Sequence, residues 1–222
     1  GSATNTDDAD GEVITTSRHR PSDAEIVQGL QGFLGEIMQV PPQFSAVKIN
    51  GQRAYKLARA GEEIEIAARP LLVEELILAD RPTLDTAVLE MTCGKGGYVR
   101  AIARDLGEKL GCYGHVANLR RIWSGPFDLE HAVTLEQIEQ FAKTPDIDQF
   151  LRPLEVGLTD LPHGTTNEEG AAKLRNGNPA ICFTKAEYGD EIWVSHEGKA
   201  QAIGRYKSGE IHPTRVLLQT KH

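Results

Sequence analysis

The chain has 222 residues, of which 40% are hydrophobic and 25% charged, and its formal net charge is −8 at pH 7. This length suits one medium-sized domain with a small second one. No stretch approaches the roughly 20 consecutive apolar residues that a membrane-spanning helix needs, so we expect no membrane partner.

The hydrophobic pattern of the first half predicts helices and strands in alternation. Residues 22–39 predict an amphipathic helix that begins with a capping box, Ser22 and Glu25, and ends at Pro41-Pro42. A strand, a tight turn at Asn50-Gly51, a short helix and two further strands are predicted to follow. Their expected ranges are 44–49 for the first strand, 53–61 for the helix, and 71–79 and 86–93 for the last two strands.

The second half predicts one long helix and then mainly short strands. The helix covers residues 98–110 and stops at Gly111. A strand over 118–127 and a helix over 134–142, capped by Thr134, are expected next. Residues 144–165 are rich in Pro, Asp and Gly, which predicts a domain boundary.

These elements predict an α+β fold. We expect a mixed, mostly antiparallel sheet with helices in residues 1–154, and a small β-rich module with one short helix in residues 155–222.

The cysteines and histidines show no spacing typical of a metal site. Cys93, Cys112 and Cys182 lie far apart with no CxxC pair, and the seven histidines form neither HxxxH nor HExxH. We therefore expect a reducing, cytoplasmic compartment, with no metal and no disulfide framework.

Positive charge is concentrated in two parts of this acidic chain. Residues 44–60 carry Lys48, Arg53, Lys56 and Arg59 with no acidic residue, and residues 92–124 are also rich in cations, among them Arg120. Such local basic surfaces suit a specific polyanion, and Phe44 and Tyr55 among the cations suit unstacked bases. The alternative is that the cations lie on solvated helix faces and the aromatic rings in the core.

Arg100 lies in the first turn of the predicted helix 98–110, directly after Gly94-Lys95-Gly96-Gly97. The helix dipole disfavours a cation there, so an anionic partner is expected unless the guanidinium reaches water. The glycines also resemble a phosphate-binding loop, although neither GxxxxGK[ST] nor GxGxxG is present. A phosphate-binding α/β protein therefore stays open as an alternative.

Taken together, several segments resemble one family, the bacterial TruB-type tRNA pseudouridine synthases, which modify the T-loop uridine at tRNA position 55. The segments that carry the resemblance are TDDADG (6–11), PPQFSAVKINGQRAYKLAR (41–59), ARPLLVEEL (68–76), CGKGGYVRAIARDLGEKLG (93–111) and HVANLRRIWSGPF (115–127). The last 65 residues or so resemble the family's small C-terminal PUA module, which binds RNA.

The resemblance implies a mechanism and a set of site residues. In this family the uridine is flipped out, an aspartate attacks, the N–C glycosidic bond breaks and a C–C bond forms at C5, without cofactor or metal. By resemblance, Arg100 pairs with the catalytic aspartate, Tyr98 and Leu119 contact the uridine, and Asp8 lies near the pocket. The tRNA-gripping surface corresponds to residues of about 40–61, with Lys48, Arg53, Lys56 and Arg59, and includes Arg120. Gly97 stands where the family usually carries threonine or serine.

One part of the family pattern is absent from the sequence. The catalytic aspartate of the family belongs to a GHxGxLDP-type motif before the TDDADG segment, and the chain contains no such motif. We therefore expect this chain alone to be inactive, and its partners to be the T-arm of tRNA and an N-terminal fragment, with the complete enzyme a monomer. The alternative within the family is an RNA-binding fragment without catalysis.

Overall fold

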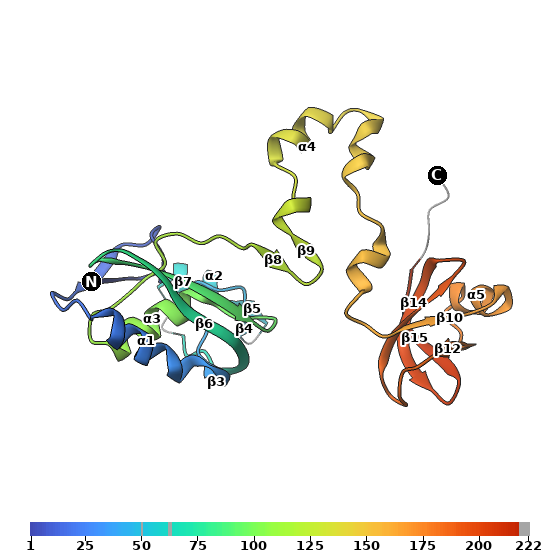
Figure 1. Ribbon diagram of the computed structural model, residues 1–222, viewed down its shortest axis with the longest axis horizontal. Helices are drawn as coiled ribbons and strands as arrows, with labels where there is room; N and C mark the ends of the chain where they lie inside the picture. The colour runs from blue at the N-terminus through green and yellow to red at the C-terminus, as the bar shows by residue number, and fades with distance from the viewer. Residues whose placement is uncertain (50, 62–63, 218–222) are drawn as a thin grey trace. The chain divides into compact units, whose positions relative to one another are not determined.

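The computed structural model describes residues 1–49, 51–61 and 64–217, and the chain forms two compact units, Gly1–Arg120 and Arg121–His222. Asn50, half of the predicted tight turn, lies outside the described residues. The predicted α+β class is confirmed: the N-terminal unit combines helices with antiparallel strands, and the C-terminal unit ends in a β-rich sheet (Figure 1).

The elements of the N-terminal unit are β1 (Ser2–Thr4), β2 (Val13–Thr16), α1 (Asp23–Leu30), η1 (Gln31–Phe33), β3 (Gly35–Gln39), β4 (Lys48–Ile49), β5 (Gln52–Arg53), α2 (Ala54–Arg59), β6 (Arg69–Thr83), β7 (Thr86–Cys93) and α3 (Val99–Lys109). Strands β3, β6 and β7 form one antiparallel sheet in that order, and β1–β2 and β4–β5 are separate hairpins.

The core of this unit lies between the sheet and two helices, α1 and α3, which run beside β6 in Figure 1. Its buried side chains come from all three elements and η1: Ile26, Leu30, Phe33, Leu71, Val73, Leu76, Ile102 and Leu106. Removing these groups from water is the main stabilising term for the unit. The packing also fixes the axis of α3, and with it the direction of the side chains that α3 carries.

The predicted helix over 22–39 is wrong in its second half. Helix α1 begins with the expected Ser22–Glu25 capping box, but it ends at Leu30, and β3 begins at Gly35. Gly35 has a φ of 81°, which favours glycine, and the residues after it pair with β6. Ile37 still packs against the core from this strand, so its apolar character fitted either structure.

Two other predicted strands are shorter than expected. Of residues 44–49, the strand β4 includes Lys48 and Ile49 alone. Of residues 118–127, Trp123–Ser124 and Phe127 belong to strands, which form a small hairpin across Gly125 at a φ of 56°. Helices α2 and α3 and strands β6 and β7 are confirmed.

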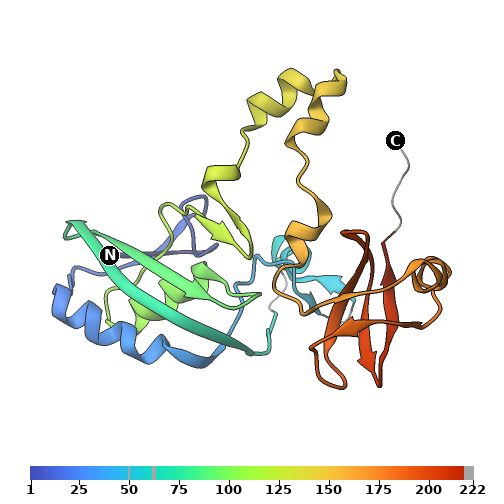
Figure 2. The ribbon, with the colours of Figure 1, turned by 45° about the vertical axis from the view of Figure 1, so that its right-hand side comes forward.

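The C-terminal unit contains β8 (Trp123–Ser124), β9 (Phe127–Asp128), η2 (Leu129–His131), α4 (Leu135–Phe141), η3 (Pro145–Phe150), η4 (Leu154–Leu158), β10 (His163–Thr165), α5 (Glu168–Arg175), β11 (Ala180–Ile181), β12 (Phe183–Thr184), β13 (Glu191–His196), β14 (Lys199–Lys207) and β15 (Glu210–Val216). The last six strands form one sheet in the order β11-β15-β14-β13-β10-β12, with α5 beside it (Figure 2). Strand β10 pairs with β13 in parallel, and the other described pairs in this sheet are antiparallel.

The packed part of this unit begins near the predicted start of the module at residue 155. Leu158 of η4 is buried with Trp193 and Ala200, and the Ala200 N–H donates to Glu155 Oε1 at 2.7 Å. All residues from 113 to 157 are described and none of them is buried. The division into compact units falls earlier, after Arg120, so the boundary between 154 and 155 stays a prediction.

Candidate functional site

A cavity of about 550 Å³ opens in the N-terminal unit next to the first turn of α3. Its walls come from the segment between β1 and β2, the segment between β3 and β4, α2 and α3. The lining residues are Thr6, Asp8, Asp10, Phe44, Ser45, Ala46, Tyr55, Arg59, Tyr98 and Arg100. The cavity therefore brings together Arg100, Tyr98 and Asp8, three residues that the sequence singled out.

The glycines before α3 bring the chain to the cavity in a defined direction. Gly96 has a φ of 91°, which favours glycine, and Tyr98 is the N-cap residue of α3 in an extended conformation. Gly97 packs closely, because a Cβ atom there would lie 2.9 Å from Cys93 Sγ. The loop thus turns the chain at Gly96 and delivers Tyr98 and Arg100 to the same side.

Arg100 has a carboxylate partner within this chain. Its Nη1 donates to Asp8 Oδ2 at 2.9 Å and to the Thr6 carbonyl oxygen at 3.1 Å, and its Nη2 donates to the Phe44 carbonyl oxygen at 2.9 Å. The Arg100 and Asp8 side chains are 27% and 26% exposed. The cation at the start of α3 is therefore compensated by Asp8 and by two backbone carbonyl groups rather than by bulk water alone.

The Arg100 guanidinium has N–H donors left over that could bind a further acceptor. A guanidinium has five N–H donors, and three of them take part in the bonds to Thr6, Asp8 and Phe44. Within the described part of the chain, Nε and the second hydrogen of Nη2 have no hydrogen-bond partner. Two donors of this kind can bind a carboxylate strongly.

Asp8 is held as an anion. Partial desolvation is the largest single effect and raises the pKa of this carboxyl, but hydrogen bonds and the Arg100 charge together outweigh it, so the pKa of Asp8 lies below its ordinary value. Thr6 Oγ1 donates to Asp8 Oδ1 at 2.6 Å, and the Asp10 N–H donates to the same oxygen at 3.2 Å. Near neutral pH the cavity wall therefore carries an ionised Asp8 beside Arg100.

Four of the five predicted RNA-binding cations lie on β4, β5 and α2: Lys48, Arg53, Lys56 and Arg59. Lys48 on β4 pairs in register with Arg53 on β5, and Arg53 Nη1 donates to the Ala46 carbonyl oxygen at 3.0 Å. Arg59 lies 5.7 Å from the centre of the Tyr55 ring, and both residues line the cavity. The Arg59 guanidinium thus lies over the Tyr55 ring in the cavity wall, and cations with aromatic rings are typical of surfaces that bind a nucleic acid strand.

Two predicted residues are not brought to the cavity. Leu119 is 58% exposed and Arg120 is exposed, and neither is among the lining residues. Their roles in uridine and tRNA binding stay predictions.

The contacts of three residues at the site were not predicted from the sequence, although Phe44 was noted there for its aromatic ring. Gln39 is buried and bonds to both backbone polar groups of Tyr98. Phe44 contributes a backbone carbonyl, which no side-chain pattern can reveal. Ser45 is buried at the cavity, and its hydroxyl has no hydrogen-bond partner among the described residues. A polar residue in an otherwise apolar stretch was the available hint for Ser45.

The described residues contain no cluster of three or more His, Cys, Asp or Glu side chains able to hold a metal ion. Among the same residues, no helix is long and apolar enough to cross a membrane.

Two family models match the chain. Residues 1–99 match the TruB family pseudouridylate synthase N-terminal domain, and residues 100–159 match the tRNA pseudouridylate synthase B C-terminal domain. The division between the two models falls inside α3, between Val99 and Arg100. Both sides of the Arg100–Asp8 pair therefore lie in family-matched sequence.

Curated relatives resemble the chain over nearly its whole length. A tRNA pseudouridine synthase B from Ruegeria sp. (strain TM1040) is 67% identical over 220 residues, which are 99% of this chain and 73% of that protein. The protein of the same name from Ruegeria pomeroyi is 66% identical over 220 residues, with the same coverage. A third, from Rhizobium johnstonii, is 44% identical over 96% of this chain and 71% of its own length.

Solved structures share the fold at low sequence identity. A chain in a crystal structure of a Cbf5–Nop10–Gar1 complex superposes with a TM-score of 0.67 at 20% identity, and the match covers 92% of this chain and 63% of that chain. A chain in an H/ACA ribonucleoprotein bound to a substrate RNA gives the same TM-score at 17% identity, over 92% of this chain and 64% of that chain. This chain thus spans less than two thirds of those chains.

With two family models and several close relatives in agreement, the chain belongs to the TruB family of pseudouridylate synthases, which isomerise uridine in tRNA to pseudouridine.

Proposed function

From the chain's place in the TruB family we propose that it supplies the arginine partner, part of the uridine pocket and the RNA-binding surface for isomerisation of the T-loop uridine at tRNA position 55. The observation that carries the proposal is the Arg100–Asp8 pair, 2.9 Å apart, in the wall of a cavity that Tyr98 and the Tyr55–Arg59 pair also line. A flipped base needs such a pocket, with aromatic groups for stacking and fixed charges for the reacting groups.

The free edge of the Arg100 guanidinium would bind the nucleophilic aspartate. That carboxylate attacks the uridine, the N1–C1′ bond breaks and the base rotates. A C5–C1′ bond then forms, the bond to the aspartate breaks and the carboxylate is regenerated, the C5 proton is lost and N1 gains a proton. Arg100 keeps the nucleophile ionised and oriented, because two parallel N–H donors favour the charged form. Asp8 holds the other edge of the same guanidinium, so that Arg100 does not turn away from the pocket.

The rest of the chain would hold the RNA. We propose the T-arm of tRNA as the partner, gripped by the basic residues of β4, β5 and α2, with Leu119 and Arg120 contacting it once it is bound. The β-rich C-terminal sheet would act as a PUA-like module that binds RNA. We propose that the complete enzyme works as a monomer in the cytoplasm, without metal or cofactor.

This proposal is tested by comparing residues 1–222 with a longer protein, called the completed chain. The completed chain joins residues 1–222 to the part of the Ruegeria sp. relative that they do not match. Both are incubated with unmodified tRNA labelled with tritium at uridine C5, and with the same tRNA carrying cytidine at position 55. We expect tritium release by the completed chain from the first tRNA alone, and tRNA binding without release by residues 1–222.

Several outcomes would contradict the proposal. Release by residues 1–222 alone would place the nucleophile inside this chain, and equal release from both tRNAs would place the modified uridine elsewhere. Binding of inorganic phosphate at the start of α3, with no affinity for tRNA, would instead favour a phosphate-binding protein.

A further inference from the structure

Arg104 lies one helical turn after Arg100 on α3 and makes similar contacts, to carboxylates and to a backbone carbonyl group. Its Nη1 donates to Asp7 Oδ2 at 3.1 Å, its Nη2 to the Val40 carbonyl oxygen at 2.9 Å, and its Nε to Asp105 Oδ1 at 2.8 Å. The Arg104 and Asp7 side chains are 21% and 14% exposed. Neither Arg104 nor Asp7 lines the cavity.

The two arginines brace the same two segments of chain. Arg100 joins Thr6 and Asp8 to Phe44, and Arg104 joins Asp7 to Val40. Residues four apart lie on one face of a helix. Each arginine of α3 therefore binds both the segment at 6–8 and the segment at 40–44. Arg100 makes its contacts at the cavity, and Arg104 makes its contacts one helical turn further along α3.

The backbone of Asp7 makes this double attachment possible. Consecutive side chains of an extended strand point in opposite directions, yet the carboxylates of Asp7 and Asp8 both meet α3. Asp7 has a φ of 61°, a left-handed conformation that costs energy for a residue with a side chain and must be held by its surroundings. Besides Arg104, these surroundings include the Val116 N–H, which donates to the Asp7 carbonyl oxygen at 3.0 Å.

Asp7 is an ionisable side chain that is buried at a cost. Burial raises the pKa of Asp7 by more than the Arg104 charge lowers it, whereas the Arg104 cation is held more by Asp105 than by Asp7. The raised pKa of Asp7 therefore comes from burial, and its contacts with Arg104 favour the ionised carboxylate. A carboxylate that is buried at such a cost points to a role beyond stability.

We infer that Arg104 and Asp7 are a positioning pair, which holds the left-handed turn at Asp7 so that Asp8 faces Arg100 at the cavity. This inference rests on the proposed function, since it assigns the pair to the same site. It makes Arg104 and Asp7 positioning residues, because they act through Asp8 and Arg100 and touch no part of the cavity.

The first experiment does not depend on activity. Hydrogen exchange of the Ala9 and Val116 amides reports on the turn, because the Ala9 N–H donates to the Val116 carbonyl oxygen and the Val116 N–H donates to Asp7. In residues 1–222, Asp7→Asn and Arg104→Met are each expected to speed this exchange by about 10-fold or more, the size of one lost charged hydrogen bond. The double variant is expected to add little to either single change, as for two partners of one interaction.

Asp85→Asn is the matched control, because it breaks another aspartate–arginine pair of the same unit, with Arg20, away from the cavity. It should leave the Ala9 and Val116 exchange rates unchanged. Equal acceleration by the control, or no acceleration by Asp7→Asn and Arg104→Lys, would overturn the inference. Arg104→Lys keeps a cation of similar length, so it carries the test if Arg104→Met does not fold.

The second experiment measures turnover in the completed chain. Asp7→Asn should lower kcat about 10-fold or more with KM nearly unchanged, and Asp85→Asn should change neither value. Equal loss of kcat in Asp7→Asn and Asp85→Asn, or a raised KM with kcat unchanged in Asp7→Asn, would overturn the inference. If the completed chain shows no activity, the proposed function fails, whereas the exchange result still decides the role of the pair.

Discussion

Gln39 satisfies both backbone polar groups of Tyr98. The Tyr98 N–H donates to Gln39 Oε1 at 2.9 Å, and Gln39 Nε2 donates to the Tyr98 carbonyl oxygen at 3.2 Å. Tyr98 is the N-cap residue of α3, and its side chain makes no capping hydrogen bond. Gln39, the last residue of β3, thus holds the start of α3 in place of a local cap.

Replacing this amide should therefore loosen α3. Gln39→Leu removes both hydrogen bonds and leaves the Tyr98 N–H buried without a partner, so we expect the N-terminal unit to lose about 2–4 kcal/mol of unfolding free energy. Hydrogen exchange of the α3 amides measures this loss. Tryptophan fluorescence does not, because Trp123 and Trp193 both lie in the C-terminal unit. Gln31→Leu, at an exposed site on η1, is the control, and an equal loss there would contradict the role of Gln39.

Arg100→Lys tests whether the planar set of N–H donors of the Arg100 guanidinium is needed at the cavity. Lysine keeps the positive charge but cannot bind Asp8, Phe44 and a further carboxylate in one fixed plane. In the completed chain we expect kcat to fall roughly 100-fold or more, with tRNA affinity changed little. Tritium release and filter binding give the two values. Arg20→Lys, away from the cavity, should be near normal. Normal turnover by Arg100→Lys would rule out the pairing with the nucleophile.

Asp7 and Asp8 should shift stability in opposite directions with pH. The pKa of Asp8 lies below 3.8, so the stability it provides is present above pH 3.8 and is lost as pH falls through its folded pKa. The pKa of Asp7 lies above 3.8 because of burial, so folding is penalised above that pKa and the penalty disappears as pH falls towards 3.8.

The two asparagine variants separate these effects. Asp7→Asn should remove the contribution of Asp7, a rise in unfolding free energy on acidification towards pH 3.8, and Asp8→Asn should remove the contribution of Asp8, a fall below that pH. Exchange of the α3 amides, corrected for the intrinsic pH dependence, measures both. Parallel pH profiles for the two variants would contradict the opposite signs.

Local sequence features predicted α3 and the start of the neighbouring helix α1. Three glycines, an apolar face and Gly111 define the helix within twenty residues, and the Ser22 capping box likewise acts over three residues. The partners of Arg100 could not be predicted in this way, because Asp8 is 92 residues away and Phe44 contributes its backbone. Family resemblance placed a carboxylate at Arg100 but expected it outside the chain, with Asp8 only near the pocket.

The role of Gln39 was hidden by a wrong secondary structure. An apolar pattern that fits one helix also fitted α1, η1 and β3 in succession, with Gly35 at a left-handed φ where β3 begins. In a helix over 22–39, Gln39 would be a polar residue in the last turn. In the observed fold it ends a strand beside α3.

Gly97 is a second position where packing decides the residue. A Cβ there would lie 2.9 Å from Cys93 Sγ and 3.1 Å from both Leu71 methyl carbons, so Gly97→Thr should destabilise the N-terminal unit by about 1–3 kcal/mol. Leu71→Val should recover part of the loss by making room. Gly94→Ala is the control, since its Cβ would meet the Leu72 carbonyl oxygen at an ordinary 3.6 Å. Chemical denaturation measures the unfolding free energy of each variant. An unchanged value for Gly97→Thr would show that Leu71 and Cys93 move aside readily.

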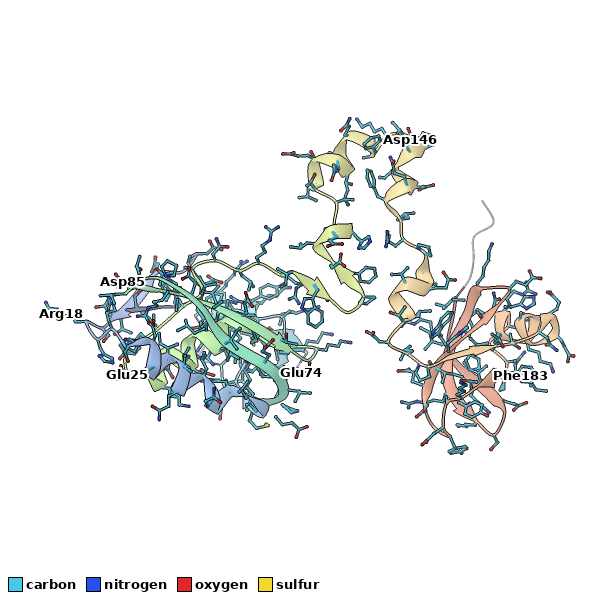
Figure 3. The ribbon with its side chains drawn as sticks, viewed as in Figure 1. Arg18, Glu25, Glu74, Asp85, Asp146 and Phe183 are labelled. Carbon is cyan, nitrogen blue, oxygen red and sulfur yellow. The ribbon has the colours of Figure 1, made fainter. Side chains whose placement is uncertain are left out.

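The C-terminal unit offers a direct test of RNA binding by the PUA-like module. A cavity of about 660 Å³ there is lined by His163, Phe183 and Lys185, among others, and Phe183 is 70% exposed on the edge strand β12, where Figure 3 labels it at the surface. An exposed ring beside a cation is typical of a surface on which a base stacks.

Phe183→Ala should therefore weaken tRNA binding by about 1–3 kcal/mol, the usual value of one stacked base. It should leave the folding of the sheet unchanged, because the ring is not part of the core. Tyr188→Ala is the matched control, since Tyr188 is exposed to a similar degree in the same unit and does not line the cavity. Filter binding with residues 1–222 measures both variants. If they weaken binding equally, or neither does, the cavity at Phe183 is not where the module holds RNA.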